Sequence, residues 1–375
     1  MSAPARPAAG PQRKVYLHIG APKTGTTYVQ DRLTLNARSL ASHGVHFPTR
    51  SPLVSPGLFH FRAALDLLGQ DWGGPPGHAQ GGWGALAGRV KRRSGTVVIS
   101  HEILAPATRE AIAKAKRDLA GSEIHIVYSA RDLARQLPAA WQESVKQGRK
   151  WSYRRFLRRV EHGKPWFYRA LDLPTVLEAW GAGIDPAHVH VVTVPPRGAP
   201  RDLLWQRYCA VLGIDPAWAP RDSDQHNQSL GIAETQVIRK LNRRMDRATR
   251  REASYDGLIR EMLAQDELVG RVSEPVRMPP RLQSWAEAEA EQWISWIRAH
   301  GVDVVGDVED LRPLPLAEDE TYLDPDKVST KQQLRVAMDA LAAMTREAAR
   351  RPDPDQQLIG KVRTRAKRLR ESRAE

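Results

Sequence analysis

The most telling stretch of this chain reads Val15-Tyr16-Leu17-His18-Ile19-Gly20-Ala21-Pro22-Lys23-Thr24-Gly25-Thr26-Thr27. It is an apolar strand that runs directly into a loop of glycine, lysine and threonine, and a helical pattern follows. Backbone N–H groups of such a loop and of the open helix N-terminus point toward one place, where the helix dipole favours negative charge. Lys23 adds a full positive charge and the threonines add hydroxyl donors. We therefore expect a ligand that carries phosphate.

The loop is similar to a P-loop but lacks its Lys-Ser/Thr pair. A Walker A loop has glycine, four residues, glycine, and then Lys-Ser/Thr. Gly20 and Gly25 keep that spacing, but Thr26 and Thr27 follow, and the lysine lies inside the loop as Lys23. No Lys-Ser/Thr pair therefore remains to hold the β- and γ-phosphates with Mg²⁺, as it would in an ATPase.

The loop resembles the 5′-phosphosulfate loop of the sulfotransferases that use 3′-phosphoadenosine 5′-phosphosulfate (PAPS). That resemblance implies PAPS as the donor, its desulfated form PAP as the product, and no metal. Lys23 would then also be catalytic, because its charge would stabilise the bridging oxygen that departs. The residues that the resemblance assigns to the donor are Pro22, Lys23, Thr24, Gly25, Thr26 and Thr27.

A second strand-to-helix junction should hold the other phosphate of the donor. Residues 124–130 are β-branched and mostly apolar, which is typical of a strand, and Arg131 follows them directly. In the family, an arginine at this strand end grips the 3′-phosphate, which suits the planar guanidinium group. The family's second ligand, a serine about eight residues later, is replaced here by Ala139. Its substitute stays open among Gln136, Gln142 and Ser144.

A third strand, 96–100, ends in Ser100-His101-Glu102. At this place sulfotransferases carry a histidine or glutamate as general base, which takes the proton of the acceptor as it attacks sulfur. Successive residues of extended backbone point to opposite sides, so one of the two should face the donor. Some bacterial relatives have a similar triplet with glutamate, which favours Glu102 and keeps His101 as the alternative. Glu102 could otherwise simply begin the next helix, where acidic residues suit the first turn.

Strands and helices alternate along the chain. This order predicts an α/β fold with a parallel sheet flanked by helices, and the resemblance implies a P-loop-like, nucleotide-binding sulfotransferase fold with a helical C-terminal part. Ligands bind beyond the C-terminal ends of such strands, so the three motifs should meet at one edge. The expected strands are 14–19, 96–100, 123–129 and 188–194, and residues 302–307 are expected to form a short strand or an extended turn. The expected helices are 26–43, 103–119, 132–148, 152–161, 173–182 and 201–213.

Two weaker signals lie elsewhere. The stretch 227–231, Asn-Gln-Ser-Leu-Gly, resembles one that precedes a long helix in related bacterial sequences, although Ser229 could equally be a helix N-cap. The glycine-rich segment 69–84 is either a mobile loop over the acceptor or a plain linker.

The 375 residues suffice for a sizeable core. We expect a disordered lead over 1–13, the sulfotransferase domain over 14–315, and a helical, basic appendage over 316–375 with helices at about 329–350 and 356–372. The formal net charge is +14, and residues 361–375 contribute +5 of it through seven Lys/Arg against two Glu. A positive surface steers a polyanionic donor, and the tail could contact an anionic membrane weakly. No nucleic-acid partner is expected.

Cys209 is the only cysteine, which excludes an internal disulfide and a cysteine-cluster metal site. No run approaches 18 apolar residues, so no membrane span is expected, and the first residues lack the apolar core of a signal peptide. These features predict a cytoplasmic protein of the soluble, bacterial type. The oligomeric state stays open.

We therefore expect a PAPS-dependent sulfotransferase that moves a sulfuryl group in line to a hydroxyl or amine. The acceptor stays open among carbohydrate, glycolipid, phenolic metabolite and peptide. One alternative is a P-loop-like kinase or NTPase, which Thr26 disfavours and for which Asp132 is the nearest Mg²⁺ ligand. The other is a non-catalytic nucleotide-binding protein, which Ala139 keeps open and the triplet 100–102 argues against.

Overall fold

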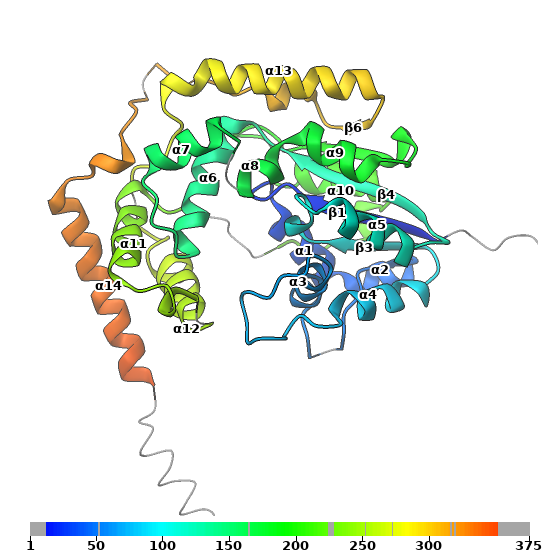
Figure 1. The fold of residues 1–375 in the computed structure, drawn as a ribbon, viewed down its shortest axis with the longest axis horizontal. Coiled ribbons are helices and arrows are strands. Elements are labelled where there is room, and N and C mark those ends of the chain that lie inside the picture. Colours follow the sequence, from blue (N-terminus) through cyan, green and yellow to red (C-terminus); the bar gives the residue numbers. More distant parts are fainter. Residues whose placement is uncertain are drawn as a thin grey trace, which may run out of the picture.

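A computed structural model describes residues 13–351, apart from 52, 164–165, 224–228, 252, 272, 316 and 319. Its centre is a six-stranded parallel sheet with the strand order β2-β3-β1-β4-β5-β6 (Figure 1). This confirms the predicted α/β class, although the two-residue β2 was not predicted. The strands are β1 (Lys14–Gly20), β2 (Val45–His46), β3 (Thr96–Ser100), β4 (Glu123–Ala130), β5 (Val189–Thr193) and β6 (Asp303–Val305).

The two faces of the sheet carry different helices because side chains alternate along each strand. In β1, Val15, Leu17 and Ile19 join the larger core, while Tyr16 joins the smaller core on the other face. The smaller core is covered by α1 (Thr26–Leu35), α2 (Ala37–Ser42) and α10 (Leu203–Leu212). The larger core is covered by α3 (Pro56–Leu67), α4 (Gly82–Lys91), α5 (Arg109–Asp118), α6 (Leu133–Lys146), α7 (Tyr153–Glu161), α8 (Trp166–Leu171), α9 (Leu173–Gly181) and α13 (Gln283–His300).

The strand order places a change of direction between β1 and β4. The chain leaves β1 toward β2 and β3 on one side, and it leaves β4 toward β5 on the other. Doubly wound sheets bind ligands beyond the strand ends at such a switch point. Here the Ala21 N–H donates to the Ser129 carbonyl at 2.9 Å, where both strands end. The loops after β1 and β4 therefore start from the same point of the sheet.

The helix expected over 103–119 is wrong in its first turns, and this matters for the site. Pro106 has no N–H to continue a helix, and Thr108 caps α5 by accepting a hydrogen bond from Ala111 N at 3.3 Å. Residues Glu102–Leu104 instead form a short 3₁₀ turn.

The helix expected over 26–43 is divided at Asn36, between α1 and α2. The Asn36 side-chain amide donates to the carbonyls of Arg32 and Arg221, both at 2.8 Å. An amide that competes for backbone acceptors in this way favours a break rather than a continuous helix.

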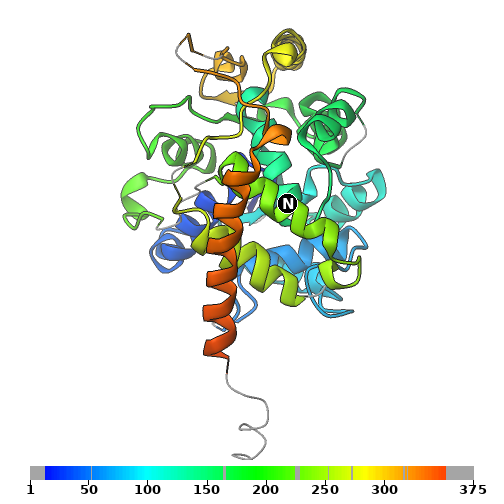
Figure 2. The ribbon, with the colours of Figure 1, turned by 90° about the vertical axis from the view of Figure 1, so that its left-hand side faces the viewer.

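The C-terminal part is helical, as predicted. It contains α11 (Ile232–Arg244), α12 (Ala253–Tyr255), a π-helix (Asp256–Glu267), α13 and α14 (Thr330–Arg350). Figure 1 shows α13 lying along one side of the sheet, and Figures 1 and 2 show α14 running along the outer side of α11. The first of these helices has Gly231, not Ser229, at its N-cap, and residues 227 and 228 lie outside the described residues.

Residues 317–351, expected as an appendage, pack onto the domain where they are described. The Asp326 carboxylate accepts hydrogen bonds from the backbone N–H groups of Tyr153 and Arg154, both at 3.0 Å, and thereby joins this segment to α7. The lead before residue 13 and the helix expected over 356–372 lie outside the described residues. No described helix is both long enough and apolar enough to cross a membrane.

Candidate active site

The loop between β1 and α1 is held by side chains that bind its carbonyl oxygens. Three consecutive carbonyls each accept one hydrogen bond, from Thr24 Oγ1 to Ala21 O (2.6 Å), from Gln136 Nε2 to Pro22 O (2.9 Å) and from Arg131 Nη1 to Lys23 O (3.0 Å). The N–H and C=O of one planar peptide unit point in opposite directions. The N–H groups of residues 23 and 24 therefore face away from these donors, toward the open side of the loop.

The backbone conformation of the loop also suits an anion. Lys23 has a φ of 67° and Gly25, the N-cap of α1, has a φ of 88°. Lys23 is the one non-glycine residue with positive φ in the described chain, a conformation that costs on the order of 1–3 kcal/mol unless its surroundings impose it. The φ of 88° favours glycine at position 25, and a Cβ there would also lie 2.5 Å from Leu204 Cδ2 and push that side chain aside. Within the described residues, the backbone N–H groups of residues 23–27 have no acceptor, and these groups form a cradle for a negative ligand.

The six residues assigned to the donor differ in accessibility. Pro22, Thr24 and Thr26 are buried, Lys23 and Gly25 are half-buried, and Thr27 is exposed. Because the Thr24 hydroxyl is used on Ala21 O, it is part of the frame of the loop. Of the three threonine hydroxyls, that of Thr27 is the one that solvent reaches freely.

The Lys23 ammonium is held by an acidic partner that no sequence motif marks. Its Nζ lies 3.2 Å from Oε2 of Glu143 on α6, and Arg260 Nη2 of the π-helix lies 3.6 Å from Oε1 of the same carboxylate. Burial raises the pKa of Glu143, but Lys23, Arg260 and the buried Lys146 outweigh it and bring the pKa to about 2. Glu143 is therefore ionised at neutral pH, and it fixes the position of the loop lysine.

Arg131 lies directly after β4, at the edge where the sequence predicts it. Its bond to Lys23 O joins the end of β4 to the loop. Burial, together with the nearby Arg135, lowers the pKa of Arg131 to about 10, so the guanidinium stays cationic at neutral pH. Its Nε is buried and has no hydrogen-bond partner within the described residues. An unpartnered buried donor is costly, and an anion at this point would satisfy it.

The three candidates for a second phosphate ligand are all engaged by the protein. Each side chain donates to a group of the chain itself: Gln136 to Pro22 O (2.9 Å), Gln142 to Leu230 O and to Thr235 Oγ1 (3.2 Å), and Ser144 to Trp141 O (2.7 Å). No replacement for the family's serine is therefore assigned among them.

The backbone of Glu102 lies directly beside the loop between β1 and α1. A Cβ on Gly20 would be 3.3 Å from Glu102 O and 3.6 Å from its Cα, so the 3₁₀ turn and the loop pack backbone against backbone. Glu102 Oε2 is buried without a hydrogen-bond partner in the described structure. Burial raises the pKa of Glu102, but His101, the backbone, His18 and Lys23 together lower it. The result is an ionised carboxylate whose Oε2 has no hydrogen-bond partner among the described residues and lies 3.8 Å from His101 Nδ1.

His101 is less suited to accept a proton. Its Nδ1 accepts a hydrogen bond from Ile103 N at 3.3 Å and caps the 3₁₀ turn. Burial lowers the pKa of His101 and favours the neutral ring, which has one N–H, so this bond assigns the proton to Nε2. The ring packs against Phe61, with 5.2 Å between centroids, and Trp72 of the glycine-rich segment packs on Phe61 at 5.2 Å. His101 therefore lies between Glu102 and the aromatic rings of Phe61 and Trp72.

A buried polar layer under the loop ties together the three strands that carry the motifs. His18 of β1 has Nδ1 2.7 Å from Ser100 Oγ of β3, and Nε2 3.1 Å from Ser129 Oγ of β4 and 2.8 Å from Tyr208 OH. Burial lowers the pKa of His18 to about 4, so the ring is neutral. The only sequence signal for this layer is a polar residue near the end of each apolar strand.

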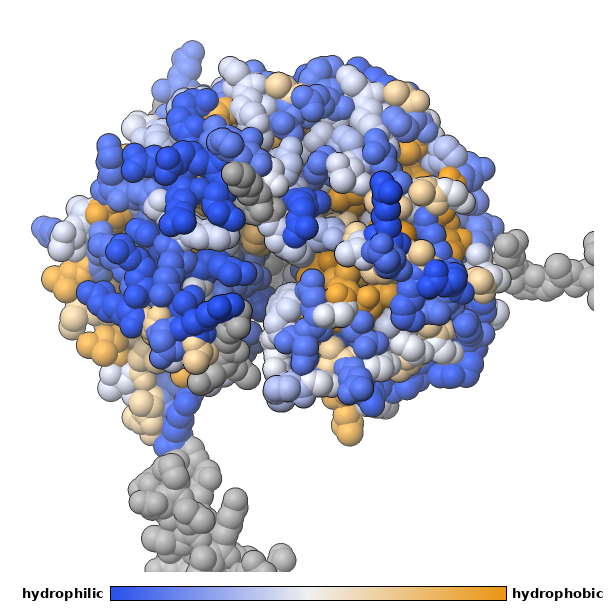
Figure 3. Space-filling view, viewed as in Figure 1, coloured by the Kyte–Doolittle hydropathy of each residue, from blue (hydrophilic) through white to orange (hydrophobic). Residues whose placement is uncertain are grey.

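The site lies where the sheet meets the C-terminal helices, since Lys23 follows β1 and Arg260 belongs to the π-helix. Figure 3 shows a notch in the surface between these two parts of the molecule, with a mostly hydrophilic surface on the helical side and a hydrophobic patch on the sheet side.

No protein-family model matches this chain, and no curated protein matches it either. Among solved structures, a sulfotransferase from Alicyclobacillus acidocaldarius is similar, with a TM-score of 0.36 and 15% sequence identity. The match covers 65% of this chain and 100% of that chain.

Proposed function

We propose that this protein is a PAPS-dependent sulfotransferase that transfers a sulfuryl group to a hydroxyl or amine. The observation that carries the proposal is the loop after β1, whose carbonyls accept hydrogen bonds from side chains, whose amides have no acceptor among the described residues, and whose lysine is paired with Glu143. Glu102 stands beside this loop with an unpartnered oxygen. A donor with phosphates at both its 5′ and 3′ positions needs two anion sites, and Arg131, which contacts the loop on its carbonyl side, would supply the second.

Each residue of the site has a part that follows from its position. PAPS, when bound, supplies the activated sulfuryl group. The amides of residues 23–27 would hold the 5′ side, and Arg131 would bind the 3′-phosphate through the donor that now lacks a partner. Lys23, held by Glu143, would place its charge near the bridging oxygen, where negative charge grows during transfer.

Glu102 would act as the general base. The acceptor oxygen or nitrogen forms a bond to sulfur, its proton moves to a Glu102 oxygen, and the electron pair of the breaking S–O bond leaves with PAP. Glu102 is ionised at neutral pH, which is the state that a base requires. His101, with its proton on Nε2, would donate a hydrogen bond and position the acceptor.

The acceptor would lie on the side of Phe61 and Trp72. The Trp72 side chain is 42% exposed and packs on Phe61, which in turn packs on His101. Aromatic faces pack well against sugar rings and other flat or apolar groups. We therefore propose a glycan, glycolipid or phenolic acceptor in preference to a peptide.

The kinase or NTPase alternative is disfavoured by the position of Asp132. Its carboxylate caps α6 by accepting from Arg135 N at 2.9 Å, and it also pairs with Arg135 Nε. Glu143 is surrounded by cations, which makes it a poor ligand for Mg²⁺. Asp132 and Glu143 are therefore both engaged by cations, which leaves Glu102, with its unpartnered Oε2, among the carboxylates described beside the loop.

Thermal unfolding with PAP and with ATP tests the proposal. A ligand at 100 times its dissociation constant adds about 2.7 kcal/mol to the free energy of unfolding. We expect saturating PAP to raise the melting temperature, ATP to raise it less, and Arg131→Ala to remove most of the PAP effect. A chain that ATP stabilises and PAP leaves unchanged would contradict the assignment.

A further inference from the structure

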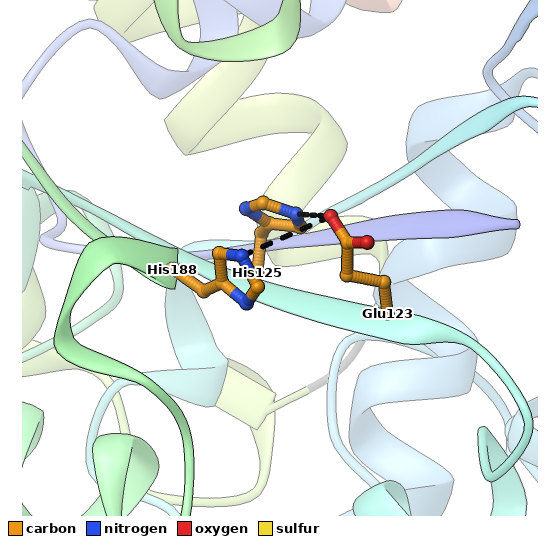
Figure 4. A group of neighbouring side chains, drawn as sticks. All are labelled: Glu123, His125 and His188. Carbon is orange, nitrogen blue, oxygen red and sulfur yellow. Dashed lines mark hydrogen bonds and ion pairs between the residues drawn. The ribbon is translucent and has the colours of Figure 1, made fainter. Parts of the chain in front are cut away.

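A second cluster of titratable side chains lies at the opposite edge of the sheet, where β4 begins (Figure 4). Glu123 and His125 belong to β4, and His188 directly precedes β5. His125 Nε2 lies 2.8 Å from Glu123 Oε1, and His188 Nε2 lies 3.9 Å from the same oxygen. One potential ligand atom of each residue lies within 4.8 Å of the others. Three side chains of the kinds that can ligate a metal therefore lie close together, at the strand ends opposite the loop after β1.

A row of hydrogen bonds extends from this point across the sheet. His125 Nδ1 lies 2.9 Å from His190 Nε2, and His190 Nδ1 lies 2.7 Å from Asp303 Oδ2. His190 and Asp303 are register partners on β5 and β6. The row from Glu123 to Asp303 has three contacts, and each needs one proton when both carboxylates are ionised. Two neutral imidazoles supply only two protons.

The row therefore lacks one proton, and this proton is missing from the contact between His125 and Glu123. When each histidine donates through Nδ1 toward Asp303, the lone pair of His125 Nε2 faces the Glu123 carboxylate. Lys14 Nζ lies 3.3 Å from Glu123 Oε1, and the Lys14 side chain is 48% exposed. Its hydrogen bond to Glu123 does not fill the space between the lone pairs of His125 Nε2 and Glu123 Oε1.

We propose that Glu123, His125 and His188 bind a divalent transition-metal ion, of which Zn²⁺ fits best, with water as the fourth ligand. Two imidazole nitrogens and one carboxylate oxygen are a common zinc donor set. Tetrahedral zinc with bonds of 2.0–2.1 Å separates its ligand atoms by about 3.3 Å, and the distances of 2.8 and 3.9 Å to Glu123 Oε1 lie on either side of that value.

The surroundings support the same ligand set. A zinc-bound histidine usually donates its other N–H to a neighbouring acceptor, which orients the ring, and His190 backed by Asp303 provides that support for His125. Tyr16 stacks on the His125 ring, with 4.4 Å between centroids, and holds it from the side. The side chains of Glu123 and His188 are 23% and 35% exposed, so an ion can enter from solvent.

The position of the cluster indicates what the ion would do. It would join the start of β4 to the turn before β5, at the end of the strands opposite Lys23 and Arg131. We therefore expect the metal to stabilise the sheet and to leave sulfuryl transfer unaffected, so this inference does not depend on the proposed function.

Isothermal titration of the full chain with ZnSO₄, after treatment with EDTA and its removal, tests the inference. We expect one site in the wild type. Glu123→Gln and His188→Gln should each weaken binding at least tenfold, and Asp303→Asn should weaken it about 10- to 100-fold through the outer support. The matched control is His300→Gln, an exposed histidine that stacks on Trp296, and it should bind Zn²⁺ as the wild type does.

Two further readouts make the outcome decisive. Zn²⁺ should raise the melting temperature of the wild type and of His300→Gln, but not that of Glu123→Gln. Co²⁺ bound in place of Zn²⁺ should give the intense visible absorption of a tetrahedral site. If the wild type does not bind Zn²⁺, a proton alone fills the space between His125 Nε2 and Glu123 Oε1. If binding persists in both Glu123→Gln and His188→Gln, the ion binds elsewhere. Either result would overturn the inference.

Discussion

Replacing Glu143 by glutamine tests whether the loop lysine is held by a buried ion pair. The Glu143 side chain is 11% exposed and lies 3.2 Å from Lys23 Nζ and 3.6 Å from Arg260 Nη2. Burial raises its pKa, but the cations bring it from an ordinary value of 4.5 to about 2. At 1.36 kcal/mol per pKa unit, the lowered pKa corresponds to about 3 kcal/mol of folding free energy at pH 7.

The pH dependence of this contribution has a definite sign. A carboxyl whose pKa is lower in the folded state stabilises the protein above its unfolded pKa, and the contribution is lost as the pH falls through the folded pKa. For the two pKa values of Glu143, the contribution of about 3 kcal/mol at pH 7 falls to roughly half of that at pH 3. The stability difference between the wild type and Glu143→Gln should shrink accordingly.

Urea unfolding at pH 7 and pH 3, followed by tryptophan fluorescence, measures this difference. The control is Glu287→Gln on α13, an exposed residue that accepts a hydrogen bond from Gln283 at 2.8 Å. It should change the free energy of unfolding by less than about 0.5 kcal/mol at either pH. A Glu143→Gln variant that is as stable as the wild type at pH 7, or equally destabilised at both pH values, would refute the ion pair as the support of Lys23.

Five further substitutions test the parts of the site, with steady-state kinetics as the readout once an acceptor is known. Lys23→Ala should lower kcat by about 10²–10³ with little change in the donor KM, since the charge of Lys23 acts mainly in the transition state. Arg131→Ala should instead raise the donor KM. The reverse pattern would exchange the roles of the two residues. Glu102→Gln should lower kcat by about 10²–10⁴ and leave PAP affinity intact, and a larger loss in His101→Gln would make the histidine the base. In Gly20→Ala the new Cβ would lie 3.3 Å from Glu102 O, and the alanine would have to adopt a φ of 136°. This variant should therefore have a lower melting temperature and a lower kcat. A fully active, stable variant would mean that the loop and the 3₁₀ turn are not tightly packed.

The sequence alone predicted that three motifs lie at one edge of the sheet, because the ends of strands can be recognised from the local sequence. Apolar runs mark the strands, and in a parallel sheet their C-terminal ends share one side. The positions of Lys23, Glu102 and Arg131 after β1, β3 and β4 follow from that rule alone. The helix expected over 103–119 was wrong in its first turns because Pro106 and Thr108, both local signals, outweigh the helical pattern.

The partners of these residues could not be predicted, because they depend on packing over long separations. Glu143 lies 120 residues from Lys23, and Arg260 reaches it from a π-helix whose position depends on the whole C-terminal part. The sequence predicted only a phosphate-binding role for Arg131. Its hydrogen bond to Lys23 O shows that it also holds the backbone of the loop in place. The row from Glu123 to Asp303 likewise exists only through the register of β4, β5 and β6.

The most direct test of the proposed function is a transfer assay with unidentified acceptors. The protein is incubated with PAPS and fractionated metabolites, glycans and glycolipids, and products that gain one sulfate are detected by mass spectrometry. The account predicts sulfated products and stoichiometric PAP with the wild type, and neither with Glu102→Gln, a variant that should still bind PAP. Equal product formation by the wild type and by Glu102→Gln would contradict the assigned base, and a wild type that neither binds PAP nor consumes PAPS would contradict the sulfotransferase assignment itself.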